Sequence, residues 1–323
     1  MVASTPRTRA IVVTPAGRGS RSGNRVTALR WAAILRRNGL QARVREAWQG
    51  EPCELLIAVH AVKTAASVAA AAAALPGLRI VVLLAGTDVY PTFEPTPAVS
   101  RVLERANALV ALQPHAATVL PAPLRPKVRT IVQSATAAPA ARAAIFRACV
   151  LAHLRPVKDP LLPITALAHV PRRHPLELVL AGRALTQELA DAVRAAAARD
   201  PRIRWLGPLR HRAARELLAS SHVCIVPSAA EGGANVVSEA IAAGTPVLAT
   251  AIPGNLGLLG ADWPATFPVG DEKKLAQLVE RAATDERWRR ELEQRLQALR
   301  PQVDPARERA AWQLLLADLG LRT

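Results

Sequence analysis

The sequence is poor in aromatic residues and in lysine. Of its 323 residues one is Tyr, three are Phe and six are Trp, and nearly all of the cationic excess is Arg, because the only lysines are at 63, 127, 158, 273 and 274. Nucleic-acid-binding surfaces usually combine a basic run with aromatic side chains that stack on bases. No such run is present, so we expect no nucleic-acid partner.

Cysteines are few and long apolar runs are missing. Cys53, Cys149 and Cys224 lie far apart, each in or beside an apolar stretch, which predicts small core residues rather than disulfides or a zinc site. The N-terminus lacks the apolar core of a signal peptide, and the Ala-rich stretch 65–75 is too short to span a bilayer. We therefore expect a soluble, cytoplasmic protein without stable membrane insertion.

Two common nucleotide-binding fingerprints are also absent. Gly17, Gly19 and Gly23 have the spacing G-x-G-x-x-x-G, which differs from the dinucleotide fingerprint, and there is no Walker lysine. This argues against an NAD-dependent dehydrogenase.

What the sequence has in excess is positive charge. Its 42 Lys and Arg residues outnumber its 25 Asp and Glu residues, for a net charge of +17. Such a balance suits anionic partners such as membrane surfaces or phosphorylated small molecules. Arginines scattered over solvated faces of an Ala- and Arg-rich chain are the alternative, and composition alone leaves both open.

Short apolar runs alternate with longer amphipathic segments along most of the chain. The predicted strands are 10–14, 42–47, 54–60, 79–86, 108–113 and 128–133 in the first half, and 148–153, 176–182, 203–207, 222–228 and 246–250 in the second. The clearest predicted helices are 24–38, 186–199, 211–220, 234–243 and 304–320. Apolar strands joined by helices predict an α/β fold with parallel sheets covered on both faces.

These strands are too many for one ordinary sheet, so we predict two Rossmann-like, doubly wound domains. The Ala- and Pro-rich stretch 134–144 is the predicted linker. We place an N-terminal domain at 1–145 and a C-terminal domain at 146–303. The amphipathic segment 304–323 is expected to form a final helix that packs across the domain junction.

One stretch after a predicted strand combines two glutamates with a glycine pair. Glu231 precedes Gly232 and Gly233, and Glu239 lies inside the helix that follows. The glycines let backbone N–H groups approach a ligand, and the helix dipole favours an anion there. Eight residues at helical rise span roughly 12 Å, so Glu231 and Glu239 suit hexose and ribose hydroxyls on either side of a diphosphate. An ordinary strand–loop–helix unit is the alternative.

A second group of polar residues follows strands of the first domain. Three arginines lie among Gly, Ser and Asn residues at the start of a helix, which predicts a cradle for a small phosphate-like anion. A mobile surface loop is the alternative, and the role of Asp88, as a cap or as a residue that orients a nucleophile, stays open. The candidate residues are Arg18, Gly19, Ser20, Arg21, Asn24, Arg25, His60, Lys63, Thr87 and Asp88.

The E-x7-E pattern after a Pro-Ser strand end, with WLG before it and EAIAAGTPVLAT after it, resembles the retaining GT-B (GT4-like) glycosyltransferases. The resemblance implies two Rossmann-like domains that face a central cleft. It also implies that a basic pair, here Arg155 and Lys158, stabilises the leaving nucleoside diphosphate, and that His60 contacts sugar. Arg155, Lys158 and Glu231 would be the catalytic residues. The implied donor-binding residues are Gly232, Gly233, Ala234, Asn235, Val236 and Glu239.

Four strings together, GSRSGNRVTALRWA, AGTDVY, HLRPVKDP and EGGANVVSEAIAAGTPVLATAIPGNLGLLG, resemble one branch, the selenosugar synthases of selenoneine biosynthesis. The resemblance implies a UDP-sugar donor, UDP-N-acetylglucosamine in particular, and selenophosphate as the nucleophile held by the Arg-rich loop. It implies no cofactor and no metal. The implied partners are these small molecules, selenophosphate synthetase and the downstream selenoneine enzyme.

Other functions remain open. An ordinary glycosyltransferase would act on a hydroxyl acceptor with a base such as Asp88, and a nucleotide-sugar epimerase would need more acidic and histidine chemistry. A non-catalytic nucleotide-sugar sensor would bind without turnover, although the intact basic pair and glutamate pair argue against a decayed enzyme.

Overall fold

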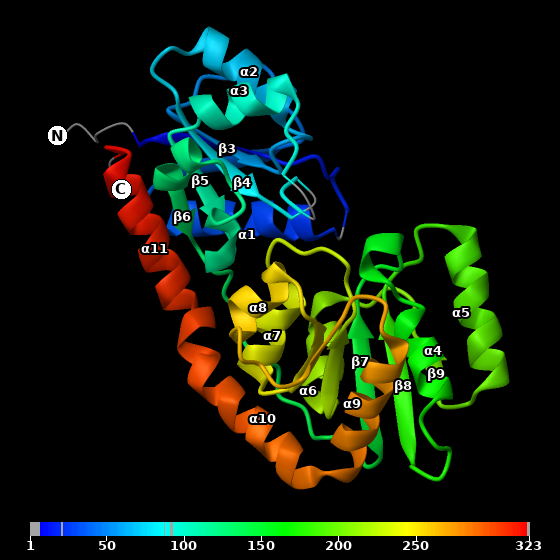
Figure 1. Cartoon of the computed structure of the whole chain (residues 1–323). Coiled ribbons are helices and arrows are strands. Elements are labelled where there is room, and N and C mark those ends of the chain that lie inside the picture. Colours follow the sequence, from blue (N-terminus) through cyan, green and yellow to red (C-terminus); the bar gives the residue numbers. More distant parts are fainter. Residues whose placement is uncertain (1–6, 21, 87, 91–92, 322–323) are drawn as a thin grey trace. The chain divides into compact units, whose positions relative to one another are not determined.

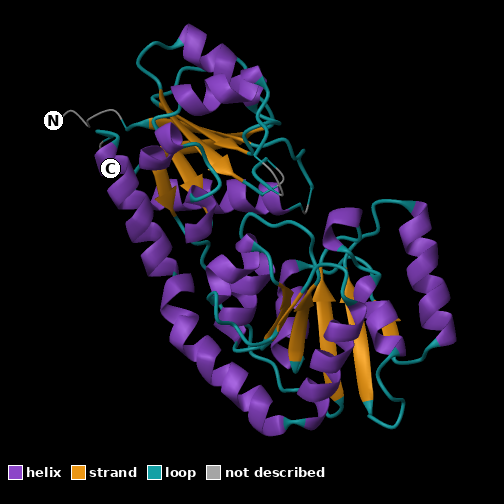
Figure 2. Cartoon of the chain, in the orientation of Figure 1, coloured by secondary structure: helices purple, strands orange, loops and turns teal. Residues whose placement is uncertain are grey.

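The computed structural model describes residues 7–20, 22–86, 88–90 and 93–321. The chain divides into two compact units, Met1–Gln133 with Ala306–Thr323 and Ser134–Pro305. Each unit has its own parallel sheet flanked by helices (Figure 2).

The first unit contains a six-stranded parallel sheet in the order β2-β1-β3-β4-β5-β6. Its strands are β1 (Arg9–Val13), β2 (Gln41–Arg45), β3 (Leu55–Val59), β4 (Arg79–Leu84), β5 (Ala108–Ala111) and β6 (Val128–Thr130). Its α-helices are α1 (Gly23–Arg37), α2 (Ala65–Ala74), α3 (Pro97–Arg105) and α11 (Pro305–Asp318). The strand order reverses between β1 and β3, so the segments that follow these two strands are neighbours at one edge of the sheet.

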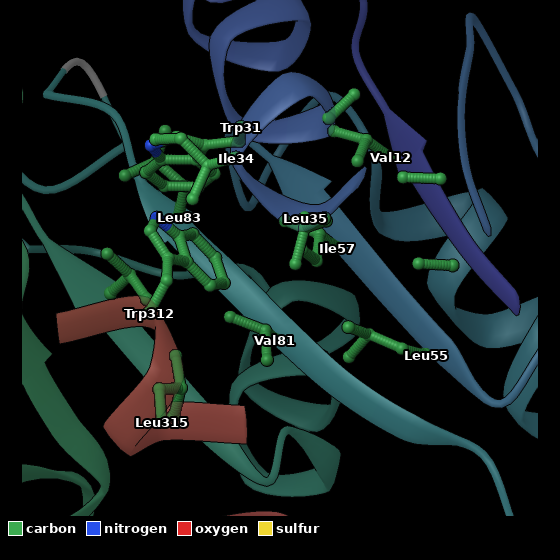
Figure 3. Close-up of a cluster of buried hydrophobic side chains, with 14 of the residues drawn as sticks. Val12, Trp31, Ile34, Leu35, Leu55, Ile57, Val81, Leu83, Trp312 and Leu315 are labelled. Atoms are coloured by element: carbon green, nitrogen blue, oxygen red, sulfur yellow. The ribbon is translucent and has the colours of Figure 1, made fainter. Parts of the chain in front are cut away.

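The main core of this unit lies between the sheet and two helices from opposite ends of the chain, α1 and α11 (Figure 3). Alternate strand residues such as Val12, Ile57 and Val81 point into it, as the period of two in a strand requires. Trp31 of α1 and Trp312 of α11 meet edge to face, with ring centroids 4.8 Å apart. Helices α2 and α3 cover the other face of the sheet (Figure 1).

The second unit contains a six-stranded parallel sheet in the order β12-β11-β10-β7-β8-β9. Its strands are β7 (Phe146–Leu151), β8 (Leu176–Ala181), β9 (Ile203–Trp205), β10 (Val223–Val226), β11 (Val247–Thr250) and β12 (Thr266–Phe267). Its α-helices are α4 (Leu162–Ala168), α5 (Gln187–Arg199), α6 (His211–Ser220), α7 (Asn235–Ala243), α8 (Pro253–Leu259), α9 (Glu272–Thr284) and α10 (Glu286–Leu299). A single 3-10 turn, η3 (Pro156–Lys158), follows β7.

Every predicted strand and each of the clearest predicted helices is confirmed, with ends that differ by a few residues. Strand β12 was not predicted, because a two-residue strand has no readable periodicity. The predicted linker 134–144 lies with the second unit, where Ala143 N–H donates to Ser220 O. Cys53, Cys149 and Cys224 are buried and free, which confirms their predicted place in the core.

Among the described residues, no helix is both long enough and apolar enough to cross a membrane.

Candidate functional site

A lysine and a glutamate that are 73 residues apart in sequence meet at one edge of the second sheet. Strands β7 and β10 are parallel neighbours, so the segments after them lie side by side. The N–H of Ala229, after β10, donates to the carbonyl of Val157, in η3 after β7, over 2.9 Å. This bond places the Lys158 ammonium against the Glu231 carboxylate, where the two form an ion pair.

The Glu231 carboxylate is held by its surroundings as well as by the lysine. Its residue is 9% exposed, and its Oε1 also accepts a hydrogen bond of 2.7 Å from Ser228 Oγ. The carbonyl of Ser228 accepts from Thr250 Oγ1 over 2.6 Å, and Asn255 Nδ2 donates to Thr250 Oγ1 over 3.0 Å. A connected network of hydrogen bonds of this kind restricts a buried polar side chain to one orientation.

The glycine pair leads from Glu231 into α7. Gly233 has a φ of 147°, a backbone conformation that L side chains rarely adopt. The N-cap residue is Ala234, whose side chain cannot cap, and the first turn of α7 contains no acidic residue. Backbone N–H groups at this helix start therefore remain available to an anion that approaches along the dipole.

The second glutamate of the pair lies on α7 and contacts the neighbouring helix. Glu239 Oε1 is 3.1 Å from His211 Nε2, at the first position of α6. The Glu239 side chain is 16% exposed and that of His211 is 60% exposed. The sequence predictions did not include His211, since nothing in a linear motif indicates that α6 and α7 are neighbours.

The remaining member of the basic pair, Arg155, immediately precedes η3 and is half-buried. Its guanidinium forms no ion pair with any other residue that the structure describes. The structure thus places the segment that contains both Arg155 and Lys158 beside the segment that contains Glu231. The predicted donor-side residues all follow β7 or β10, or lie on α7.

In the first unit, the predicted anion loop follows β1. Gly19 has a φ of 82°, and the backbone N–H of Arg18 donates to Glu46 Oε1 over 2.9 Å. The loop leads into α1, whose first turn contains Asn24 and Arg25 and no acidic residue. Arg21 lies outside the described residues. Glu46, which follows β2, is a contact that sequence reasoning missed.

The next two strand ends in this sheet are joined by Asp88. Its buried carboxylate accepts backbone N–H bonds from Ala61 over 2.8 Å, Ala85 over 3.1 Å and Gly86 over 2.8 Å. The carboxylate thereby ties the end of β3 to the end of β4. This geometry is that of a residue that organises two loops. Thr87 lies outside the described residues.

His60 lies beside this carboxylate in an unusual backbone conformation. Its φ is 82°, and its Nδ1 is 3.6 Å from Asp88 Oδ2. Positive φ in a non-glycine residue is costly and concentrates at functional sites. Burial holds the pKa of His60 below its ordinary value, with Asp88 acting in the opposite direction. Lys63, three residues on, is exposed.

No group of three or more His, Cys, Asp or Glu side chains with the geometry to hold a metal ion occurs in the described part of the chain. The groups that suit an anionic ligand are instead cationic side chains and the backbone N–H groups at helix N-termini.

The second half of the chain matches a known family. Residues 145–298 match the model of the family described as glycosyl transferases group 1. No curated protein sequence matches the chain.

Several solved structures are similar to the whole chain. Anabaena Alr3699/HepE in complex with UDP-glucose has a TM-score of 0.76 at 16% identity, over 97% of this chain and 100% of that chain. Sucrose-phosphate synthase from Thermosynechococcus elongatus has a TM-score of 0.79 at 14% identity, over 98% and 100%. A glycosyltransferase from Rickettsia africae has a TM-score of 0.77 at 11% identity, over 99% and 100%. The chain therefore has the GT-B fold of two Rossmann-like domains, and residues 145–298 are similar to the glycosyl transferases group 1 family.

Proposed function

We propose that the protein is a UDP-sugar-dependent glycosyltransferase that forms a carbon–selenium bond between UDP-N-acetylglucosamine and selenophosphate. The observation that supports the donor half most strongly is the Lys158–Glu231 pair beside the open start of α7. It lies at the carboxyl ends of parallel strands, where open α/β sheets bind their ligands. The similar Anabaena protein is described in complex with UDP-glucose, which supports a UDP-sugar as the donor class.

The donor diphosphate would bind at the start of α7, between the glycines and the basic pair. Arg155 and Lys158 would stabilise the negative charge that develops on the leaving UDP, together with the backbone N–H groups of α7. An ammonium has three N–H donors, so Lys158 can keep Glu231 in place and still reach a phosphate oxygen. Glu231 would position the sugar and Glu239 the ribose. Because these groups would neutralise the charge of the diphosphate, we expect no requirement for a metal ion.

The acceptor half of the proposal rests on the loop after β1. Selenophosphate carries a phosphoryl group, and its selenium is a strong, largely anionic nucleophile that needs no general base. Arg18 and Arg25, for which the structure shows no ion pair within the described residues, flank a glycine turn at the start of α1 and provide positive charge for such an anion. A neutral hydroxyl acceptor would need no such cradle.

In the proposed reaction, selenium attacks C1 of the sugar while the bond from C1 to the UDP oxygen breaks, and its electron pair leaves with UDP. Water then cleaves the selenium–phosphorus bond, which releases inorganic phosphate and leaves the selenol on C1. Selenophosphate would come from selenophosphate synthetase, and the seleno-sugar would pass to the next enzyme of selenoneine biosynthesis. We place the reaction in the cytoplasm, since free thiols and a selenol suit a reducing compartment.

The test is an anaerobic incubation with UDP-N-acetylglucosamine and selenophosphate, followed by mass spectrometry. We expect UDP together with a selenium isotope pattern on hexosamine, both lost in Glu231→Ala and in Arg21→Ala, and both retained when EDTA is added. Formation of UDP only with a hydroxyl acceptor would instead show an ordinary glycosyltransferase. Binding of UDP-sugar with no turnover under any condition would show a sensor.

A further inference from the structure

We propose that His211 is a positioning residue that orients Glu239 toward the ribose hydroxyls of the donor. This inference rests on the proposed function, because it assigns a role to a side chain that contacts the proposed ribose ligand. It names a residue outside the E-x7-E motif, on a different helix and 28 residues away in sequence.

The hydrogen bond between His211 and Glu239 has a defined donor and acceptor. A carboxylate only accepts hydrogen bonds, so Nε2 of His211 must carry the proton that bridges the 3.1 Å to Glu239 Oε1. Each carboxylate oxygen has two lone pairs, and the imidazole occupies one of the four. The other positions remain free to accept from vicinal hydroxyls, while the imidazole restricts rotation of the glutamate side chain.

The stability of helix α6 does not explain why position 211 is a histidine. Helix α6 begins with Arg210 as N-cap, His211 and Arg212, without a side-chain cap and without an acidic residue in its first turn. Cations are unfavourable at a helix N-terminus, where Ser, Thr, Asn or Asp would cap the free N–H groups. Local helix stability therefore gives no reason for a histidine here, whereas its contact with Glu239 does.

Stabilisation of the folded state does not explain the pair either. The His211 side chain is 60% exposed, so solvent screens its side of the pair and the contact should contribute little to folding. What the contact supplies is orientation. Helix α7 presents Glu239 about one turn from its start. A long glutamate side chain without a partner would lose rotamer entropy each time it bound a ribose.

The test compares two nucleotides in calorimetric titrations of the full chain, UDP and 2′,3′-dideoxyuridine diphosphate. We expect the native protein to prefer UDP, and Glu239→Ala to abolish that preference. For His211→Ala we expect UDP binding to weaken about fivefold to tenfold, because the ribose would then have to order a freely rotating Glu239 side chain, while binding of the dideoxy nucleotide stays unchanged. His211→Gln, whose amide retains an N–H donor, should recover most of the preference.

Arg212→Ala is the matched control. Arg212 is the next residue on the same turn, and its guanidinium pairs with Glu216 of the same helix over 2.8 Å. We expect native affinity for both nucleotides, and a thermal melt of every variant reports on folding.

The outcomes separate the two proposals. Equal binding of both nucleotides by the native protein, or no binding of either, overturns the proposed ribose contact and this inference with it. A native preference that Glu239→Ala abolishes but His211→Ala leaves intact overturns this inference alone. An equal loss for both nucleotides in His211→Ala also overturns it, because the histidine would then act on another part of the ligand or on the fold.

Discussion

Gly254 and Glu231 are in direct backbone contact. A Cβ built on Gly254, near the start of α8, would lie 2.1 Å from the carbonyl oxygen of Glu231. Only glycine allows this approach, and the approach places the second residue of α8 directly behind the glutamate of the candidate site.

We predict that Gly254→Ala destabilises the protein although alanine is the better helix former. Propensity alone would stabilise α8 by about 1 kcal/mol. The clash with the Glu231 backbone should outweigh this gain and lower the free energy of unfolding by about 1–3 kcal/mol. Urea unfolding measures the change. Gly77→Ala is the control, because nothing lies within 4 Å of its Cβ. A stabilised Gly254→Ala variant would refute the contact.

Lys158 and Glu231 should show strong energetic coupling. Their side chains are 18% and 10% exposed, so Lys158→Met leaves a mostly buried carboxylate without its counter-charge. We expect a loss of about 1–3 kcal/mol in the free energy of unfolding. Adding Glu231→Gln should recover part of that loss, because no charge is then left unpaired. A double-mutant cycle from denaturant unfolding measures the coupling, and strictly additive effects would contradict the ion pair.

His222 should make stability depend on pH. Burial first, and then the nearby Arg289, Arg142 and Arg147, lower the pKa of His222 to about 4. Its Nδ1 also accepts the backbone N–H of Arg147 over 3.1 Å, which requires that nitrogen to be unprotonated.

The folded-state pKa of His222 lies below its unfolded value of about 6.5. The stabilisation is therefore complete above pH 6.5 and is lost as the pH falls toward 4, because the unfolded chain takes up the proton first. The total loss should be at most about 3 kcal/mol. His222→Asn, whose Oδ1 can accept the same N–H, should flatten the unfolding free energy between pH 6.5 and 4. An unchanged slope in that variant would count against the buried neutral histidine.

The C-terminal helix should be essential to the first unit. Trp312 is fully buried against Trp31, and Glu308 of the same helix accepts from Trp31 Nε1 over 3.2 Å. Trp312→Ala should lower the free energy of unfolding by about 3–5 kcal/mol. Leu314→Ala is the matched control on the same helix, since Leu314 is 69% exposed, and it should change stability by less than about 0.5 kcal/mol. Similar effects of the two changes would mean that α11 does not pack as described.

The order of strands and helices along the chain could be predicted from sequence because each element has its own local hydrophobic periodicity. Apolar runs such as 54–60 and 176–182 are short enough to be strands and too uniformly apolar to be half-exposed, so they must lie inside a covered parallel sheet. The sequence also indicated which segments contain the candidate donor-site residues, since Glu231 and Lys158 both come after such strands.

Contacts between distant segments could not be predicted in this way. The strand order that makes β7 and β10 neighbours creates the Lys158–Glu231 pair, and no local pattern encodes that order. The same is true of Gly254 behind Glu231. In sequence, a glycine between proline and asparagine is compatible with many local structures, and only the tertiary structure shows that Gly254 packs against the Glu231 backbone.

The sequence by itself determined which residues end strands and start helices, and hence where helix-start N–H groups and charged side chains would gather. Tertiary structure alone decided which of them meet. It paired Lys158 with Glu231, engaged the Asp88 carboxylate with three backbone N–H groups, and set His211 against Glu239. The physical reason is that periodicity and capping act within a few residues, whereas hydrogen bonds between loops depend on sheet order and on the packing of helices far apart in the chain.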